Sequence, residues 1–164
     1  MRSGRNDLEA MALRNPVIRP GRIEEAPALS ALALRSKASW GYSQDLVKLF
    51  QAELTLPAVE IEHVQVVELE GRPVAFYSLQ PVSTSRVELG HLFVEPSLLR
   101  HGLGRLMIAD ALRRASAGGF RVLEIQGDPN AEPFYVQVGA RRIGDRESES
   151  VPGRMLPLFE IAIS

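Results

Sequence analysis

The sequence predicts a single α+β domain built on a mixed, partly antiparallel sheet. Two alternating apolar segments meet at the turn signal Glu70-Gly71, which predicts a β-hairpin, and other strands are separated by amphipathic helices, which predict crossovers. The chain has 164 residues, of which 45% are hydrophobic and 24% are charged, with no internal repeat and no linker. This length and composition fit one globular domain with its own core.

The domain is expected to begin after a polar stretch. Residues 1–14 show no periodic pattern and are predicted to form a flexible arm, so the domain is assigned to residues 15–164. A short strand is predicted at 17–19, where prolines stand on both sides. Ala and Leu at helical spacing then predict a helix from Ile23 to about Lys37, with Pro27 tolerated in the first turn.

A loop at Ser36–Ser43 is expected to join this helix to a second one. Ser43 is a suitable N-cap residue, and the apolar stripe behind it predicts a helix to about Leu54. The hairpin follows at 64–80, and a further strand is predicted at Val87–Val94.

The strongest helical pattern in the chain runs from Gly102 to Ala117. Its apolar residues share one broad face, and Arg105, Asp110 and Arg113 are expected on the opposite, polar face. The remaining predicted elements are a strand at 122–125, a short helix from Asp128-Pro129-Asn130 to Gln137, a strand at 141–143, a loop at 147–153 and a final strand at 155–163.

Composition excludes several functional classes. The chain has no cysteine, so it has no disulfide framework, thiol nucleophile or cysteine-based zinc site, and its three histidines lack metal-ligand spacing. A net charge of −1 argues against a nucleic-acid partner. Without such ligands we expect no metal, and because the sequence has neither a secretory signal nor a long apolar run, we expect no membrane partner and a cytoplasmic location.

The sharpest local feature is the segment Val94–Arg105, where a strand ends at Pro96 and Gly102 and Gly104 open the amphipathic helix. Glycines let a ligand approach the backbone closely, and the unpaired N–H groups of a first helical turn favour an anion. Further donors come from three side chains, Arg100, His101 and Arg105. The segment predicts a phosphate-binding loop, and the alternative is a glycine turn needed only for packing.

A second feature lies about thirty residues further on. Within Asn130–Ala140, the pair Phe134-Tyr135 occupies a short helix that ends at Gly139. On local sequence alone, Tyr135 could equally be a core residue with a bonded hydroxyl.

Together the two segments resemble the GCN5-related N-acetyltransferase (GNAT) family. The family's Gln/Arg-x-x-Gly-x-Gly/Ala signature, which follows a Val-x-Pro element, is matched by Val94-Glu95-Pro96 and Gly102-Leu103-Gly104, although Leu99 stands at its first position. The Asn…Ala-x-x-Phe-Tyr-x-x-x-Gly ending is matched by residues 130–139, with the asparagine closer to the alanine than in many members. The resemblance implies a mixed, mostly antiparallel sheet of about seven strands flanked by about four helices.

The resemblance also implies acetyl-CoA as co-substrate. Its pantetheine arm would run along the fourth strand, Val87–Val94, where a bulge frees backbone N–H groups and Gly90 suits the distortion. The residues expected to bind it are Phe93, Val94, Arg100, His101, Gly102, Leu103, Gly104, Arg105 and Asn130.

The implied reaction is direct attack of an amine on the thioester, since no cysteine can carry an acyl group. The resemblance makes Tyr135 the expected general acid, and Glu88 and His91 are candidate bases, with Glu124 a further candidate on the next strand. Strict alternation puts Glu88 and His91 on opposite faces, but a bulge would reset that parity. The alternatives are a solvated strand position for each glutamate and a structural role for His91.

The acceptor is expected beside the 36–43 loop, where Trp40 and Tyr42 would form an aromatic wall and Arg154 could meet a carboxylate. The alternatives are rings that cap the core and a solvent-facing arginine. The sequence thus predicts an N-acetyltransferase acting on a small-molecule amine. Two alternative functions are a non-catalytic acyl-CoA sensor and a protein N-terminal or lysine acetyltransferase. The sequence does not decide whether the protein forms a homodimer.

Overall fold

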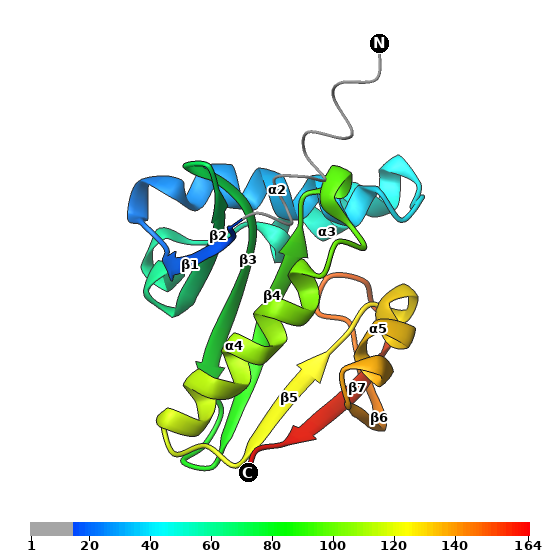
Figure 1. The fold of residues 1–164 in the computed structure, drawn as a ribbon. Helices are drawn as coiled ribbons and strands as arrows, with labels where there is room; N and C mark the ends of the chain where they lie inside the picture. The colour runs from blue at the N-terminus through cyan, green and yellow to red at the C-terminus, as the bar shows by residue number, and fades with distance from the viewer. Residues whose placement is uncertain (1–14) are drawn as a thin grey trace.

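The structure is a computed structural model that describes residues 15–164; the predicted flexible arm, residues 1–14, lies outside the described residues. Its strands are β1 (Val17–Pro20), β2 (Val64–Leu69), β3 (Arg72–Pro81), β4 (Arg86–Val94), β5 (Val122–Gln126), β6 (Arg141–Glu147) and β7 (Met155–Ala162). They form a seven-stranded sheet in the order β1-β2-β3-β4-β5-β7-β6 (Figure 1). Only the pair β4–β5 is parallel, which confirms the predicted α+β class with a mostly antiparallel sheet.

Helices cover both faces of this sheet. The α-helices of the described chain are α2 (Ala26–Ala38), α3 (Gln44–Leu54), α4 (Leu103–Ala117) and α5 (Glu132–Gln137), and short 3-10 turns are η1 (Ile23–Glu25), η2 (Ala58–His63), η3 (Pro96–Leu98) and η4 (Pro129–Ala131). Successive residues of β3 point to opposite sides, so Tyr77 joins the core under α4 and Phe76 joins a separate core with α2 and α3. In Figure 1, α4 crosses in front of β3 and β4.

Local signals in the sequence account for two of the junctions. The Ser43 side chain accepts a hydrogen bond from the Leu46 N–H at 3.2 Å, as expected of an N-cap. At the hairpin, Glu70 and Gly71 both have positive φ, 47° and 79°, as a type I′ turn requires.

Strands β4 and β5 are paired only along the first half of β4. Their parallel pairing runs only from Arg86↔Val122 to Leu89↔Ile125, whereas β4 stays paired with β3 as far as Val94. Beyond Leu89, the edge of β4 that faced β5 therefore has no strand partner among the described residues. Along this stretch, a ligand with hydrogen-bonding groups could pair with the β4 backbone in place of a strand.

A β-bulge lies where the strands separate. The β3–β4 register changes from Leu79↔Leu89 to Ser78↔His91, which leaves Gly90 as the extra residue, as expected from the sequence. A Cβ at Gly90 would stand 2.8 Å from the Ser78 hydroxyl oxygen, so only glycine fits without a shift.

The bulge resets the side-chain parity of β4. Leu89 packs in the core under α4, so its neighbour Glu88 points to the other face. His91 lies 5.9 Å from Phe76, ring centre to ring centre, and Phe76 belongs to the core of that other face. Glu88 and His91 therefore share one face, which strict alternation would have forbidden.

Three expectations need correction. Helix α2 continues to Ala38, so the predicted 36–43 loop is shorter, because Ser36 is buried against the core. Strand β6 extends to Glu147 since its pairing with β7 continues to Met155. Asp110 was expected on a polar face but is 3% exposed.

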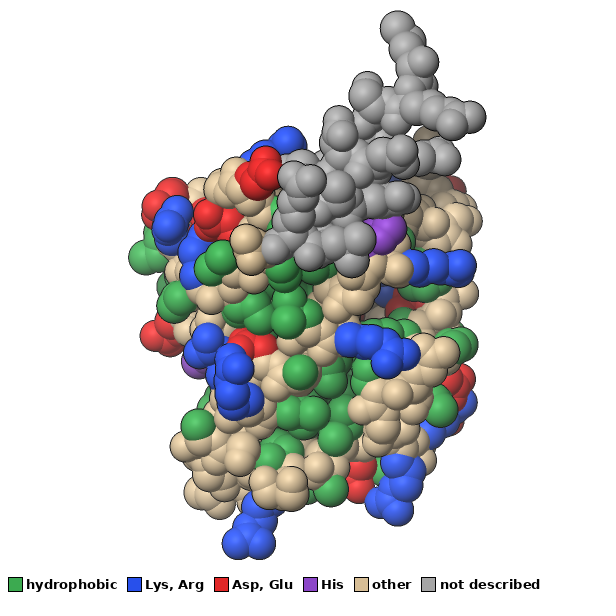
Figure 2. All heavy atoms as spheres, viewed as in Figure 1, with side chains coloured by type: hydrophobic (Ala, Val, Ile, Leu, Met, Phe, Trp, Pro, Cys, Tyr) green, Lys and Arg blue, Asp and Glu red, His purple; other side chains and the backbone are tan. Residues whose placement is uncertain are grey.

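Burial of Asp110 is possible because donors surround its carboxylate. The Tyr77 hydroxyl donates to it at 2.5 Å and the Arg114 Nε at 2.8 Å, and Arg113 adds an ion pair from the next turn. On the face that carries α4, basic side chains are separated by hydrophobic and uncharged surface (Figure 2). In the described part of the chain, no helix has the length and apolarity needed to cross a membrane.

Candidate active site

The loop before α4 has the geometry of an anion-binding turn. Gly102 is the N-cap residue with φ +85°, and Arg100 adopts φ +67°, a conformation that is uncommon for a non-glycine residue. The N–H groups of the first helical turn, at Leu103, Gly104 and Arg105, have no intrahelical partner, and Gly102 has no side chain with which to cap them. These donors and the dipole of a fifteen-residue helix can receive a phosphate.

Packing explains the second glycine of the motif. A Cβ on Gly104 would lie 2.9 Å from the Cζ atom of Phe134, so the ring of Phe134 occupies the space that a side chain would need. The Arg105 guanidinium donates to the side-chain oxygen of Gln137 at 3.2 Å and so joins the same two helices. The two sequence motifs are thus in direct contact, and the packing of α5 against α4 leaves no space for a side chain at Gly104. Arg100 is exposed, and His101 is partly exposed.

The unpaired edge of β4 carries the backbone donors expected for a pantetheine arm. The Glu95 N–H donates to the Val74 carbonyl at 2.8 Å, so alternate N–H groups from Phe93 back also face β3. The N–H groups of Val94 and Leu92 therefore face the open edge. The Phe93 N–H faces β3 rather than the open edge, so Leu92, which the sequence analysis did not name, joins Val94 as a candidate backbone donor.

Tyr135 is buried between α5, β7 and the residue that follows β5. Its ring centre lies 5.5 Å from that of Phe159 and 5.2 Å from that of Phe134, and a Cβ on Gly127 would approach the ring to 2.8 Å. Burial, together with the negative charge of Asp128, raises the pKa of Tyr135 well above its ordinary value. The hydroxyl is therefore protonated at neutral pH and able to donate.

The two carboxylate candidates, Glu88 on β4 and Glu124 on β5, have different surroundings. Burial raises the pKa of Glu88, only partly opposed by Arg146, whose Nη1 is 3.9 Å away. The pKa of Glu124 is lowered, because hydrogen bonds from Arg146 and Arg86 outweigh its burial. Of these two carboxylates, Glu88 is the one with the weaker ion pairing and the more suitable pKa for accepting a proton.

His91 is held in an apolar setting. Its Nδ1 lies 2.8 Å from the Ser78 hydroxyl oxygen, and its ring centre lies 6.1 Å from that of Phe93. Burial lowers the pKa of His91, against the opposing charges of Glu60 and Glu53. The imidazole is therefore neutral at pH 7.

Five polar side chains from four segments of the chain meet beyond the end of β5. We call this group the Asp128 cluster; its members are Lys37, Tyr42, Asp128, Asn130 and Arg154. The Tyr42 hydroxyl donates to the Asp128 carboxylate at 2.8 Å and accepts from Arg154 Nη2 at 2.8 Å and from Asn130 Nδ2 at 2.9 Å. Lys37 Nζ donates to the same carboxylate at 2.5 Å.

The cluster joins three residues that the sequence analysis named for two different roles. Tyr42 and Arg154 were expected at the acceptor and Asn130 at the cofactor, and the structure hydrogen-bonds all three together. Asp128 and Lys37 were missed; the N-cap position of Asp128 was the available signal, since its side chain accepts from the Asn130 N–H.

Electrostatics fix the protonation of the cluster. The hydrogen bond and charge of Lys37 outweigh burial and hold the pKa of Asp128 below its ordinary value. Burial, and then the hydrogen bond to Asp128, raise the pKa of Tyr42 to about 12. At neutral pH, Asp128 is thus ionised and Tyr42 is neutral.

Trp40 does not form the expected aromatic wall with Tyr42. Its side chain is 45% exposed, while the Tyr42 ring packs edge-on against Phe50 at a centre-to-centre distance of 5.2 Å. The partner ring, Phe50, was missed because it lies on α3, at a position that the sequence pattern assigns to the core.

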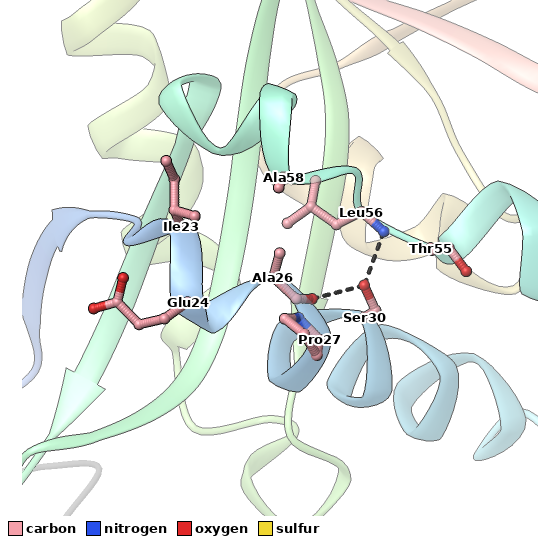
Figure 3. Close-up of a pocket in the computed structure, with 8 residues that line it drawn as sticks. All are labelled: Ile23, Glu24, Ala26, Pro27, Ser30, Thr55, Leu56 and Ala58. Carbon is pink, nitrogen blue, oxygen red and sulfur yellow. Dashed lines mark hydrogen bonds between the residues drawn. The ribbon is translucent and has the colours of Figure 1, made fainter.

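A pocket of about 440 Å³ lies away from these residues, between the start of α2 and the segment that follows α3 (Figure 3). The Ser30 hydroxyl at its wall donates to the Ala26 carbonyl and accepts from the Leu56 N–H, so it has no donor left for a ligand. The lining includes none of the predicted site residues.

Comparison with known proteins identifies the family. The model of the acetyltransferase (GNAT) family matches residues 29–140, more than half of the chain, so this chain belongs to the GNAT family. No curated protein matches its sequence.

Solved structures share the fold. A GCN5-related N-acetyltransferase from Rhodopseudomonas palustris is 19% identical, with a TM-score of 0.75 over 90% of this chain and 96% of that one. The PaiA N-acetyltransferase from Thermoplasma acidophilum, in complex with coenzyme A, is 16% identical, with a TM-score of 0.75 over 90% and 99%. The ribosomal-protein-S18-alanine N-acetyltransferase from Escherichia coli is 20% identical, with a TM-score of 0.68 over 92% and 95%. With the family match, this places the chain among the GNAT-type transferases.

Proposed function

We propose that the protein transfers an acetyl group from acetyl-CoA directly to the amine of a small molecule. The observation that carries the proposal is the loss of the β5 partner along β4 immediately before an uncapped helix N-terminus. Acetyl-CoA has one part for each feature: an extended amide-containing arm that can pair with a strand edge, and a pyrophosphate that can sit on a helix N-terminus.

In this proposal the protein binds and orients, and acetyl-CoA supplies the activated acyl group. The first-turn N–H groups of α4 hold the pyrophosphate, and the N–H groups of Leu92 and Val94 bind along the arm. A backbone N–H aimed at the thioester oxygen stabilises the negative charge that develops there. Asn130 donates a hydrogen bond to the Tyr42 hydroxyl and so orients this side chain.

Two protons must move during transfer. The attacking amine loses one as its nitrogen bonds to the carbonyl carbon, and Glu88 or His91 accepts it. The carbon–sulfur bond breaks, and the buried hydroxyl of Tyr135 gives its proton to the departing sulfur. No thiol in the chain can carry the acetyl group in between, so transfer is direct.

The proposal is tested with the purified chain, acetyl-CoA and a panel of small amines. We expect millimolar acetyl-CoA to raise the melting temperature and some amines to release free CoA with formation of an acetylated product, detected by mass spectrometry. Absence of both stabilisation and calorimetric heat with acetyl-CoA would refute the proposal.

One departure from the family signature favours a second candidate, a non-catalytic acyl-CoA sensor. Leu99 replaces the Gln or Arg of the signature and is 38% exposed just before the anion-binding turn. A sensor binds acetyl-CoA in the same assay but yields no acetylated product with any amine, which separates the two candidates.

A further inference from the structure

The Asp128 cluster holds more positive charge than negative charge. Among residues 15–164, Lys37 and Arg154 are ion-paired with one carboxylate, Asp128, and the side chains of Lys37, Arg154 and Asp128 are only 13%, 18% and 10% exposed. Sequestering an unmatched charge from water is costly unless a counter-charge arrives. On the neighbouring strands, by contrast, the arginines Arg86 and Arg146 are matched by Glu88, Glu124 and Glu160. The cluster therefore has room for one more negative charge.

The hydrogen-bond inventory gives the same result. The Asp128 carboxylate already accepts from Lys37, from Tyr42, and from both the backbone and side-chain nitrogens of Asn130. Within residues 15–164, Lys37 spends one donor, and Arg154 uses only its Nη2 atom, 2.8 Å from Tyr42 and 3.8 Å from Asp128. The acid is saturated, whereas the two cations have donors to spare.

Aromatic rings hold the cations in place. Lys37 Nζ lies 4.8 Å from the centre of the Phe50 ring, and the guanidinium carbon of Arg154 lies 5.0 Å from it. Both cations also lie within 6 Å of the Tyr42 ring centre, at 5.7 Å and 5.3 Å. The cation pair is thus positioned before any ligand arrives, which reduces the entropy cost of binding one.

The cluster adjoins the proposed reaction centre. Asp128 follows Gly127, the residue against which the Tyr135 ring packs. On the other side, Tyr42 packs on the same core as Phe93 of the open part of β4. A molecule seated at the cluster can therefore place another group towards the edge of β4.

We propose that the acceptor is an amine that also carries a carboxylate, such as an amino acid, and that Lys37 and Arg154 bind this carboxylate. The inference rests on the proposed acetyltransferase function. A singly charged carboxylate balances the surplus of one positive charge, and the planar guanidinium can present paired donors to its two oxygens. Specificity would arise because an amine without the carboxylate leaves the surplus positive charge of the cluster unbalanced.

The test compares amino acids with the amines formed by their decarboxylation, such as phenylalanine with phenethylamine and tyrosine with tyramine. We expect kcat/KM of the wild-type protein to favour the carboxylated member by about tenfold or more in accepted pairs. Phosphoethanolamine serves as a third arm, because a guanidinium also fits phosphate.

Variants locate the effect. Arg154→Ala and Lys37→Met should raise KM for the carboxylated amine about tenfold and leave the decarboxylated amine nearly unchanged, whereas Arg154→Lys should restore part of the preference. Arg141→Ala, which removes an exposed cation paired with Glu160, is the matched control and should alter neither. Circular dichroism and the Kd for acetyl-CoA, both expected to be unchanged, show that each variant remains folded.

The outcomes separate the inference from the function on which it rests. Equal or faster transfer to decarboxylated amines, or an equal loss on both members in Arg154→Ala, overturns the carboxylate assignment while the acetyltransferase function stands. A clear preference for phosphoethanolamine overturns it in favour of phosphate. If acetyl-CoA binds but no amine in any arm is acetylated, both the function and the inference fail.

Discussion

Tyr135 is the residue whose chemistry the structure constrains most tightly. It is buried and its pKa is raised, so its hydroxyl keeps its proton at neutral pH and has that proton to donate during the reaction. We predict that Tyr135→Phe lowers kcat by about a hundredfold, because the sulfur leaves without a proton donor. The Kd for acetyl-CoA, measured by calorimetry, should stay nearly constant, since the ring packing is kept. An unchanged kcat would remove Tyr135 from the mechanism.

The tautomer of His91 follows from its single hydrogen bond. Ser78 is 1% exposed, and the only hydrogen-bond partner of its hydroxyl among residues 15–164 is His91 Nδ1. A buried hydroxyl proton needs an acceptor, so we predict that Ser78 donates and that the neutral His91 carries its proton on Nε2. Long-range proton–nitrogen NMR at neutral pH reports this directly.

The comparison variant for this experiment is Ser78→Ala, in which the preference for the Nε2-protonated form should weaken. A protonated Nδ1 in the wild-type protein would show the hydrogen-bond assignment to be wrong. If the prediction holds, Nε2 of the neutral ring is a donor, and Glu88, whose pKa burial raises, is the remaining base on β4.

At the scale of elements, Asp128 connects the segment after β5 with α2, through Lys37, and with the loop before β7, through Arg154. Asp128→Asn keeps the shape but leaves Lys37 unpaired in a mostly buried place, so we predict a loss of about 3 kcal/mol in the free energy of unfolding at pH 7. Asp145→Asn, in an exposed ion pair with Arg142, should cost less than about 1 kcal/mol.

The pH dependence of this difference has a definite sign. Because the pKa of Asp128 is lowered by folding, its contribution is present above its unfolded pKa of about 4 and is lost as the pH falls through the folded value. The gap between wild type and Asp128→Asn in urea unfolding should therefore shrink below about pH 4. A gap that widens on acidification would contradict the ion-pair account.

The contact between α4 and α5 offers a second test of element packing. We predict that Gly104→Ala destabilises the protein by about 1–3 kcal/mol, because its Cβ would meet Phe134 at 2.9 Å. Gly144→Ala on β6 is the control, since nothing lies within 4 Å of its added Cβ. Urea unfolding measures both, and equal stabilities would show that Gly104 is not required for packing.

Across the whole molecule, local sequence patterns predicted the helices, strands and turns better than they predicted the contacts between these elements. The Ser43 cap, the Glu70-Gly71 turn and the bulge at Gly90 each have a local signal, and the structure contains all three. The burial of Asp110 could not be read from α4 alone, because its partner Tyr77 lies on another element. Element type depends on neighbours in sequence, whereas burial depends on neighbours in space.

The candidate site follows the same division. The glycine turn before α4 was visible as a motif, but the role of Gly104 depends on Phe134, thirty positions away. Lys37 and Asp128 became candidate site residues only once the last turn of α2 was seen to meet the segment that follows β5. The sequence therefore offered more candidates for the proposed cofactor side than for the proposed acceptor side, to which the structure adds Lys37, Phe50 and Asp128.

The central claim is that acetyl-CoA lies along the open edge of β4 with its pyrophosphate on α4. Hydrogen–deuterium exchange, with and without saturating acetyl-CoA, tests it most directly. We predict new protection at the N–H groups of Leu92 and Val94 and in the first turn of α4, with little change in β2, which is already paired on both sides. Binding of acetyl-CoA that leaves exchange at both of these places unchanged would contradict the account.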